Sequence, residues 1–121
     1  MRILIVDDSN IIRARIARIA LHPQLRKLNI VGLARNGVEA IEICRRITPD
    51  LVTMDLTMPE MDGISCIKKL IDHDSMINIL VVSALNDKTT AIHALKAGAR
   101  GFLHKPFSDE QLVSALIEVM N

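Results

Sequence analysis

Residues 2–8 read Arg-Ile-Leu-Ile-Val-Asp-Asp, in which four aliphatic residues are followed directly by two carboxylates. The uniformly apolar run at residues 3–6 is typical of a strand that is buried on both faces, as strands are in a parallel sheet covered by helices. Such a strand has no packing reason to end in two adjacent negative charges, because burying an unpaired carboxylate is costly. Asp7 and Asp8 therefore need an explanation beyond the fold.

Apolar runs of this kind recur along the 121 residues, and a helical pattern follows each of them. They cover residues 2–6, 28–34, 51–54, 77–82 and 101–104. Strands that alternate with helices pair in parallel through right-handed crossovers, so that helices cover both sides of one sheet. The sequence therefore predicts an α/β fold, a three-layer (βα)5 domain, and the length fits a single domain over residues 1–121.

The helices are predicted from apolar residues that recur at helical spacing. The side chains expected to face the sheet are, in chain order, Ile12, Ile16, Ile19 and Ala20; Ala40, Ile41, Cys44 and Ile47; Ile64, Ile67, Leu70 and Ile71; Ala91, Ala94 and Leu95; and Leu112, Ala115, Leu116 and Val119. Arg13, Arg15 and Arg18 are expected to point away from the sheet. Gly98 is expected to end the fourth helix, and Ser108 with Gln111 has the capping-box spacing that begins the fifth.

The fifth helix carries a second apolar line, formed by Val113, Ile117 and Met120. One interpretation is a broad buried face. The other is a partner surface formed together with the fourth helix and the fifth strand, close to Phe102 and His104. The sequence leaves both open.

Composition excludes several classes of protein. Fifteen basic residues against fourteen acidic ones, with a formal charge of +1 and two phenylalanines as the only aromatics, do not favour binding to nucleic acid or to a membrane surface. Cys44 and Cys66 lack metal-ligand or disulfide spacing and are expected to be free and buried. No apolar stretch approaches the ~18 residues of a membrane span or resembles a signal peptide, so we expect a cytoplasmic protein.

Polar residues follow four of the predicted strands. Asp7 and Asp8 follow the first, Asp55 the third, Ser83 the fourth and Lys105 the fifth. Each alone fits a helix cap or a solvated side chain, but the carboxyl ends of parallel strands meet at one edge of the sheet, where ligands bind. Three carboxylates there repel one another by ~4 kcal/mol per pair at a separation of about 4 Å. A hard divalent cation such as Mg²⁺ would relieve that repulsion.

The residues around these strand ends resemble the receiver domain of bacterial two-component response regulators, and most closely the single-domain chemotaxis (CheY-like) type. The resemblance covers essentially the whole chain. It rests on the following stretches: Val6-Asp7-Asp8-Ser9, residues 54–63 (Met-Asp-Leu-Thr-Met-Pro-Glu-Met-Asp-Gly), Val82-Ser83-Ala84, and residues 94–99 (Ala-Leu-Lys-Ala-Gly-Ala) leading to Lys105-Pro106-Phe107. It implies a flavodoxin-like (CheY-like) fold with strand order 2-1-3-4-5.

The resemblance also implies a function in phosphorelay signalling. Asp55 would accept a phosphoryl group from a sensor histidine kinase or a small phosphodonor, with Mg²⁺ held by Asp7, Asp8, Asp55 and the backbone carbonyl of Thr57. Lys105 would bind a phosphoryl oxygen. Such a protein catalyses only its own phosphorylation and dephosphorylation, and is expected to be a monomer.

The resemblance further implies a switch and a cis peptide bond. Ser83 and Phe102 would respond to phosphate and change a face made of helix 4, strand 5 and helix 5, which binds an output protein such as the flagellar motor switch. The peptide bond Lys105-Pro106 would be cis. The chemotaxis prototype usually has Asn at Thr57, Thr at Ser83 and Tyr at Phe102, and Glu is common at Leu85. These departures leave the lifetime of the phosphorylated state open.

Other functions fit less well. A haloacid-dehalogenase-type phosphatase needs an Asp-x-Asp motif on its first strand, whereas Asp55-Leu56-Thr57 lacks the second acid. A dinucleotide-binding unit needs a glycine-rich first turn, where residues 7–10 carry negative charge instead. A receiver that is a fragment of a larger regulator, or a phosphate sink without output, remains an alternative.

Overall fold

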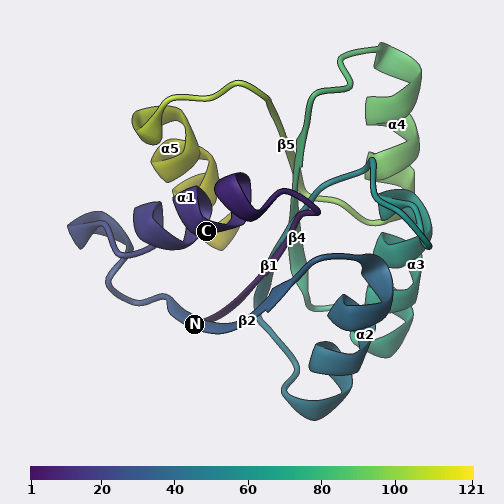
Figure 1. The fold of residues 1–121 in the computed structure, drawn as a ribbon, viewed down its shortest axis with the longest axis horizontal. Helices are drawn as coiled ribbons and strands as arrows, with labels where there is room; N and C mark the ends of the chain where they lie inside the picture. The colour runs from purple at the N-terminus through teal and green to yellow at the C-terminus, as the bar shows by residue number, and fades with distance from the viewer.

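The computed structural model describes residues 1–121, and a single five-stranded sheet lies at its centre (Figure 1). The strands are β1 (Arg2–Val6), β2 (Asn29–Ala34), β3 (Leu51–Met54), β4 (Asn78–Ser83) and β5 (Gly101–His104). All neighbouring strands are parallel, and their order is β2-β1-β3-β4-β5. The predicted fold class, strand order and strand positions are confirmed, the last to within one residue at each end.

Helices cover both faces of this sheet. They are α1 (Asn10–Ile19), α2 (Gly37–Arg46), α3 (Gly63–His73), α4 (Lys88–Ala97) and α5 (Asp109–Met120), with a short 3₁₀ helix η1 (Pro23–Leu25) after α1. Figure 1 shows α1 and α5 together on one side of the sheet and α2, α3 and α4 on the other. None of these helices combines the length and the apolar composition that crossing a bilayer requires.

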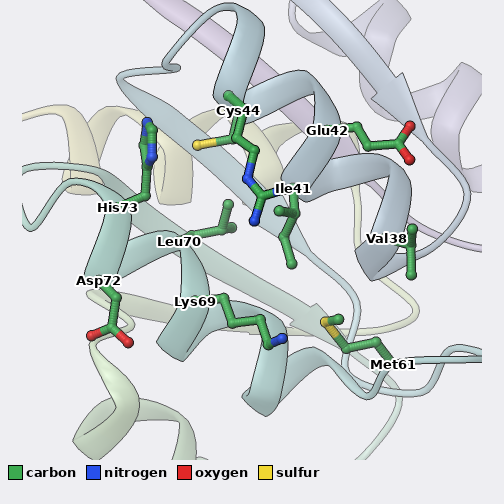
Figure 2. Close-up of a pocket in the computed structure, with 10 residues that line it drawn as sticks. Val38, Ile41, Glu42, Cys44, Met61, Lys69, Leu70, Asp72 and His73 are labelled. Atoms are coloured by element: carbon green, nitrogen blue, oxygen red, sulfur yellow. The ribbon is translucent and has the colours of Figure 1, made fainter.

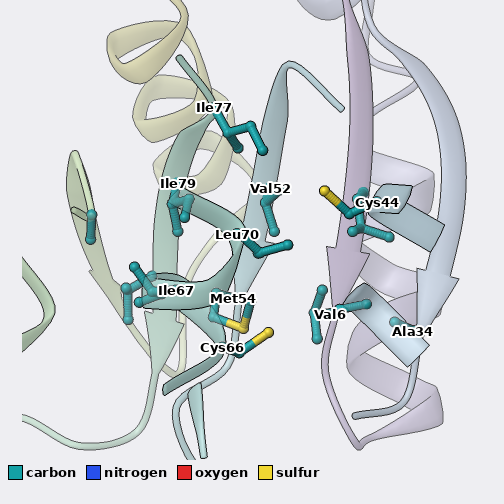
Figure 3. Close-up of a cluster of buried hydrophobic side chains, with 14 of the residues drawn as sticks. Val6, Ala34, Cys44, Val52, Met54, Cys66, Ile67, Leu70, Ile77 and Ile79 are labelled. Carbon is teal, nitrogen blue, oxygen red and sulfur yellow. The ribbon is translucent and has the colours of Figure 1, made fainter. Parts of the chain in front are cut away.

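Each layer of helices encloses a hydrophobic cluster with its face of the sheet. The α2–α4 cluster contains 16 buried residues, among them Val6, Met54, Ile67 and Leu70, which Figure 3 shows between the strands and α3. The α1–α5 cluster, on the opposite face, contains 14 buried residues and includes Leu116. Because β1, β3 and β4 contribute alternate side chains to both clusters, both faces of these strands are mainly apolar.

Polar caps fix where the helices begin. The residues before the five α-helices are Ser9, Asn36, Asp62, Asp87 and Ser108, and each side chain accepts a hydrogen bond from a backbone N–H of the first turn. The predicted capping box of Ser108 and Gln111 is confirmed. Gly98 ends α4 with a φ of 125°, a backbone conformation that glycine adopts without strain.

Three predicted orientations are wrong. Ile47 is 43% exposed because α2 ends one residue earlier and Ile47 has an extended backbone. Leu95 is 52% exposed, and Ala94 is the only residue of α4 that is buried. Arg13 was expected to point outward with Arg15 and Arg18, but its side chain is buried beneath the end of β1.

The second apolar line of α5 faces away from β5, whereas a partner surface with α4 and β5 would need the side of α5 that faces β5. Val113 is buried in the α1–α5 cluster, and Ile117 and Met120 pack against the same cluster and line a groove with residues of η1. The side of α5 that approaches Phe102 of β5 instead presents polar residues, including Ser114. The interpretation of a broad buried face is therefore confirmed, and this line is not part of a surface with α4 and β5.

Candidate functional site

Three carboxylates converge where β1 and β3 end. Asp7, Asp8 and Asp55 each offer one oxygen atom such that these atoms all lie within 4.8 Å of one another. The parallel pairing of β1 with β3 places Val6 beside Met54, so the residues that follow them leave the sheet at the same level. Asp7 and Asp55 are buried, whereas Asp8 is exposed, so the cluster is open to solvent on one side.

Lys105 supplies the positive charge closest to these carboxylates. Its Nζ lies 2.7 Å from Oδ2 of Asp7 and 3.6 Å from Oδ1 of Asp55. The side chain leaves the loop after β5, where the Lys105–Pro106 peptide bond is cis, as the family resemblance implied. One lysine against three carboxylates leaves the cluster with net negative charge.

The environment of Asp55 opposes its ionisation. Burial, followed by the negative charge of Asp7, raises the pKa of Asp55 from 3.8 to about 6, against the opposing effects of Lys105 and of the Thr57 backbone N–H. That N–H lies 3.4 Å from Oδ1 of Asp55. A further positive charge beside Asp55 would favour its charged form.

The backbone around the carboxylates is held closely. Oδ1 of Asp7 accepts a hydrogen bond of 2.9 Å from the Ser9 N–H, and Nη1 of Arg13 donates one of 2.6 Å to the Asp7 carbonyl. Gly63 packs directly against the Asp55 backbone, because an added Cβ there would lie 2.4 Å from the Asp55 carbonyl oxygen. The glycine thus allows the loop after β3 to fold back beside Asp55.

Ser83 and Phe102 lie on neighbouring strands. Ser83 is fully buried, and its Oγ accepts a hydrogen bond of 3.1 Å from the Leu85 N–H. In the sheet, Ser83 pairs with His104, whose ring makes an edge contact with Phe102 at a centroid distance of 5.1 Å. Phe102 is partly exposed and packs against the α2–α4 cluster.

The donor set fits a magnesium ion. Mg²⁺ prefers oxygen ligands, keeps several waters and binds through one or two carboxylates. The three clustered carboxylates supply such oxygens, and the exposed side at Asp8 leaves room for water. Thr57 is also exposed at this edge, in the loop after β3.

A separate groove of about 400 Å³ lies between α2 and α3 (Figure 2). Apolar side chains such as Ile41 and Leu70 line it together with charges of both signs, including Glu42 and Lys69. It contains none of the residues at the strand ends, so the chemistry suggested by the sequence does not lie there.

Comparison with known proteins settles the family. The sequence profile of the response regulator receiver domain matches residues 3–117. The chain belongs to the response regulator receiver domain family. Its function is therefore phosphorelay signalling in a two-component system, and neither the phosphatase nor the nucleotide-binding alternative is favoured.

Individual relatives of this receiver extend over nearly the whole chain. It is 39% identical to the chemotaxis protein CheY of Bacillus subtilis over 99% of this chain and 98% of the relative, and 42% identical to CheY of Thermotoga maritima over 98% and 96%. Among solved structures, CheY in the CheX-CheY-BeF3-Mg complex from Borrelia burgdorferi superposes with a TM-score of 0.92 at 29% identity, covering 100% of this chain and 90% of that one.

The structure brings together Asp7, Asp8, Asp55 and Lys105, which the sequence selected, and places Ser83 on the neighbouring strand β4. The buried position of Arg13 beside Asp7 was not predicted from the sequence. Helical periodicity placed this arginine outside because it lies beside Ile12, but position 13 is also three residues before the buried Ile16, on the edge of the inward face. A charged residue at the edge of the inward face, about one turn after two carboxylates, could have indicated that Arg13 lies near the acidic cluster.

Proposed function

We propose that residues 1–121 form one receiver domain that accepts a phosphoryl group on Asp55 in a Mg²⁺-dependent reaction and passes the signal to a protein partner. The observation that supports it best is the cluster itself: a buried carboxylate with a raised pKa, two further carboxylates within 4.8 Å and one lysine at the same edge. The high identity to CheY proteins supports a role of the chemotaxis type.

In the proposed reaction an oxygen of Asp55 attacks the phosphorus of a phosphohistidine on a sensor histidine kinase, or of a small acyl phosphate. The bond from phosphorus to the donor atom breaks, and the electron pair leaves with the imidazole or the acetate. Lys105, now paired with Asp7, would turn to a phosphoryl oxygen and offset the added charge. Water later hydrolyses the acyl phosphate, so the protein acts on its own Asp55.

The metal would be held by Asp7, Asp8, Asp55 and the backbone carbonyl of Thr57. When bound, Mg²⁺ supplies positive charge that screens the incoming phosphoryl oxygens from the carboxylates. The chain's own residues fix the geometry: Ser9 and Lys105 hold Asp7, and Gly63 allows the close backbone approach beside Asp55.

Ser83 and Phe102 would form the switch. The Ser83 hydroxyl would leave the Leu85 N–H and turn to a phosphoryl oxygen, and the partly exposed Phe102 would move inward behind it. His104, which pairs with Ser83 and contacts Phe102, would move with them. Such a change transmits a signal only through different partner affinities in the two states.

The partner surface would be formed by α4, β5 and the polar side of α5. α4 presents exposed Ile92 and Leu95, and β5 presents Phe102. The partners would be a sensor histidine kinase and an output protein, for which a flagellar motor switch or a CheX-like protein is a candidate because a related CheY was crystallised with CheX. The receiver would act as a monomer, with no nucleic acid or membrane as partner.

The acceptor is tested by incubating the protein with acetyl phosphate and Mg²⁺, trapping the product with borohydride and mapping it by mass spectrometry. Label is expected on Asp55 in the parent and on no residue in Asp55→Asn. Label on Asp7, Asp8 or Asp62 with Asp55 unmodified would refute the assignment.

The switch is tested by recording backbone amide shifts with and without beryllofluoride, a phosphoryl mimic. Changes outside the acceptor site should concentrate in residues 84–120, which contain α4, β5 and α5. Leu95→Glu should then weaken output binding without changing Asp55 phosphorylation, whereas Leu21→Glu, at a still more exposed leucine after α1, should leave output binding unchanged. Shifts confined to Asp7, Asp8 and Asp55 would favour the phosphate sink.

A further inference from the structure

Arg13 is the only cation among the buried side chains, with 9% of its surface exposed. It forms no ion pair, although other arginines of the chain do. Burying a guanidinium that lacks a carboxylate partner is unfavourable unless its donors are otherwise satisfied. Packing of α1 alone would be served better by an apolar residue, as at Ile16 one turn later.

The donors of Arg13 bind two neutral oxygens. Nη1 donates a hydrogen bond of 2.6 Å to the backbone carbonyl of Asp7, and Nη2 donates to the Asn10 side-chain oxygen. Asp7 is therefore held at both ends, because its carboxylate contacts Lys105 and the Ser9 N–H while its carbonyl contacts Arg13.

The Asp7 carbonyl belongs to the planar peptide unit that joins Asp7 to Asp8. Its orientation therefore fixes where the Asp8 Cα lies, which is the point from which the Asp8 side chain leaves the backbone. Asp8 takes no part in the side-chain hydrogen bonds at this edge, yet its carboxylate lies with those of Asp7 and Asp55. The position of this exposed carboxylate depends on the backbone before it.

We propose that Arg13 is a positioning residue for the metal site, which holds the Asp7–Asp8 peptide so that Asp8 stays beside Asp7 and Asp55. The inference rests on the proposed Mg²⁺ site. Residues that orient metal ligands from outside the coordination sphere commonly change affinity by about 10- to 100-fold when removed.

The sign of the effect separates positioning from charge. If Arg13 acted only through its charge, removing it would tighten Mg²⁺ binding, because a nearby cation repels the ion. If it positions Asp8, removing it weakens binding in spite of that gain. A purely structural role would lower the melting temperature and leave the Mg²⁺ dissociation constant unchanged.

The test measures Mg²⁺ affinity by isothermal titration calorimetry for the parent, Arg13→Met, Arg13→Lys and the control Arg18→Met, an exposed arginine on the same helix. Arg13→Met should weaken binding by about tenfold or more. Arg13→Lys keeps the charge but has a single nitrogen in place of the two that bind Asp7 and Asn10, so it should weaken binding less, and Arg18→Met should match the parent.

Arg13→Lys also keeps the test decisive if Arg13→Met does not fold. If Arg13 acted only through its charge, Arg13→Lys would bind Mg²⁺ as tightly as the parent. At saturating Mg²⁺, phosphorylation of Asp55 by acetyl phosphate should return close to the parent rate, since Arg13 forms its hydrogen bonds with Asp7 and Asn10 and none with Asp55. Parent-like or tighter Mg²⁺ binding in the folded Arg13 variants overturns this inference alone. A parent that binds no Mg²⁺ overturns the proposed function as well.

Discussion

The acidic edge of the sheet and the α1–α5 cluster lie on the same strands but contribute to stability in opposite directions. In the cluster, 14 buried apolar side chains pack between α1, α5 and the sheet. At the edge, only a few residues further along β1 and β3, Asp7 and Asp55 are buried close to each other with one lysine between them. Stability comes from the apolar cluster, whereas the acidic edge reduces it in the metal-free protein.

This difference shows why the functional residues lie at strand ends. A rigid parallel sheet fixes the two carboxylates in place, so that they cannot separate to relieve their repulsion. The same charges then favour a divalent cation and, through it, an added phosphoryl group. Mutations in the two regions should therefore change the free energy of unfolding with opposite signs.

The largest effect is expected for Leu116→Ala in α5. Leu116 is fully buried in the α1–α5 cluster, and truncating such a leucine costs about 2 to 5 kcal/mol of unfolding free energy. Leu21→Ala, at a residue 74% exposed, is the matched control and should change stability little. Urea denaturation followed by circular dichroism measures both. Equal losses in the two variants would contradict the described core.

The next effect is expected for Asp55→Asn in the metal-free protein and depends on pH. Because the pKa of Asp55 in the folded protein is about 6 rather than 3.8, the folded state binds this proton more tightly than the unfolded chain does. The stability that results is present below about pH 4 and is lost as the pH rises through 6.

Asp55→Asn carries no such charge, so at pH 8 it should exceed the parent in stability by roughly 3 kcal/mol, and the gap should close toward pH 4. Urea unfolding at several pH values gives the comparison. Parent and variant curves that run parallel from pH 4 to 8 would mean that Asp55 does not titrate in this range.

Bound Mg²⁺ should reverse the loss of stability that the clustered carboxylates of the acidic edge cause. At 100 times its dissociation constant, an ion that binds only the folded state adds about 2.7 kcal/mol of stability. Asp8→Ala should slightly stabilise the metal-free protein by removing one repelling charge, and should lose most of the Mg²⁺ effect. Thermal melting with and without Mg²⁺ measures this, with Ca²⁺-free buffer and chelator as the reference. An unchanged melting curve in both proteins would rule out the three-carboxylate site.

Most of the fold and the acidic edge could be predicted from the sequence because both follow from periodic patterns. Buried parallel strands are apolar throughout, and polar residues at their ends must meet at one edge. The errors lie where periodicity is ambiguous. Leu95 matches the inward spacing of α4 but is exposed, since the buried face of this helix is narrow and Ala94 is its only buried residue.

Arg13 shows the second limit of the sequence. A helical wheel assigns a charged residue to solvent, whereas in the structure a backbone carbonyl and an amide oxygen accept hydrogen bonds from its two terminal nitrogens. Such partners leave no side-chain pattern in the sequence, since every residue has a carbonyl group. The direction of the second apolar line of α5 likewise depended on how α5 is rotated against η1.

The smallest effect is expected at Thr53, which lies between the acidic edge and the α1–α5 cluster. This residue lies on β3 two positions before Asp55, is 1% exposed, and has the one buried side-chain oxygen without a hydrogen-bond partner. In the sheet it pairs with Ile5 and Leu80, which both belong to the α1–α5 cluster.

A buried hydroxyl without a partner is unfavourable, so Thr53→Val, which has nearly the same shape, should stabilise the protein by about 1 kcal/mol. Thr53→Ala removes the hydroxyl and also a methyl group, and the resulting cavity should make it less stable than Thr53→Val. Urea denaturation of the three proteins distinguishes these terms. If Thr53→Val instead destabilises the protein, the hydroxyl has a partner such as an ordered water, and the polar character of the acidic edge extends one layer deeper into the sheet than the apolar packing indicates.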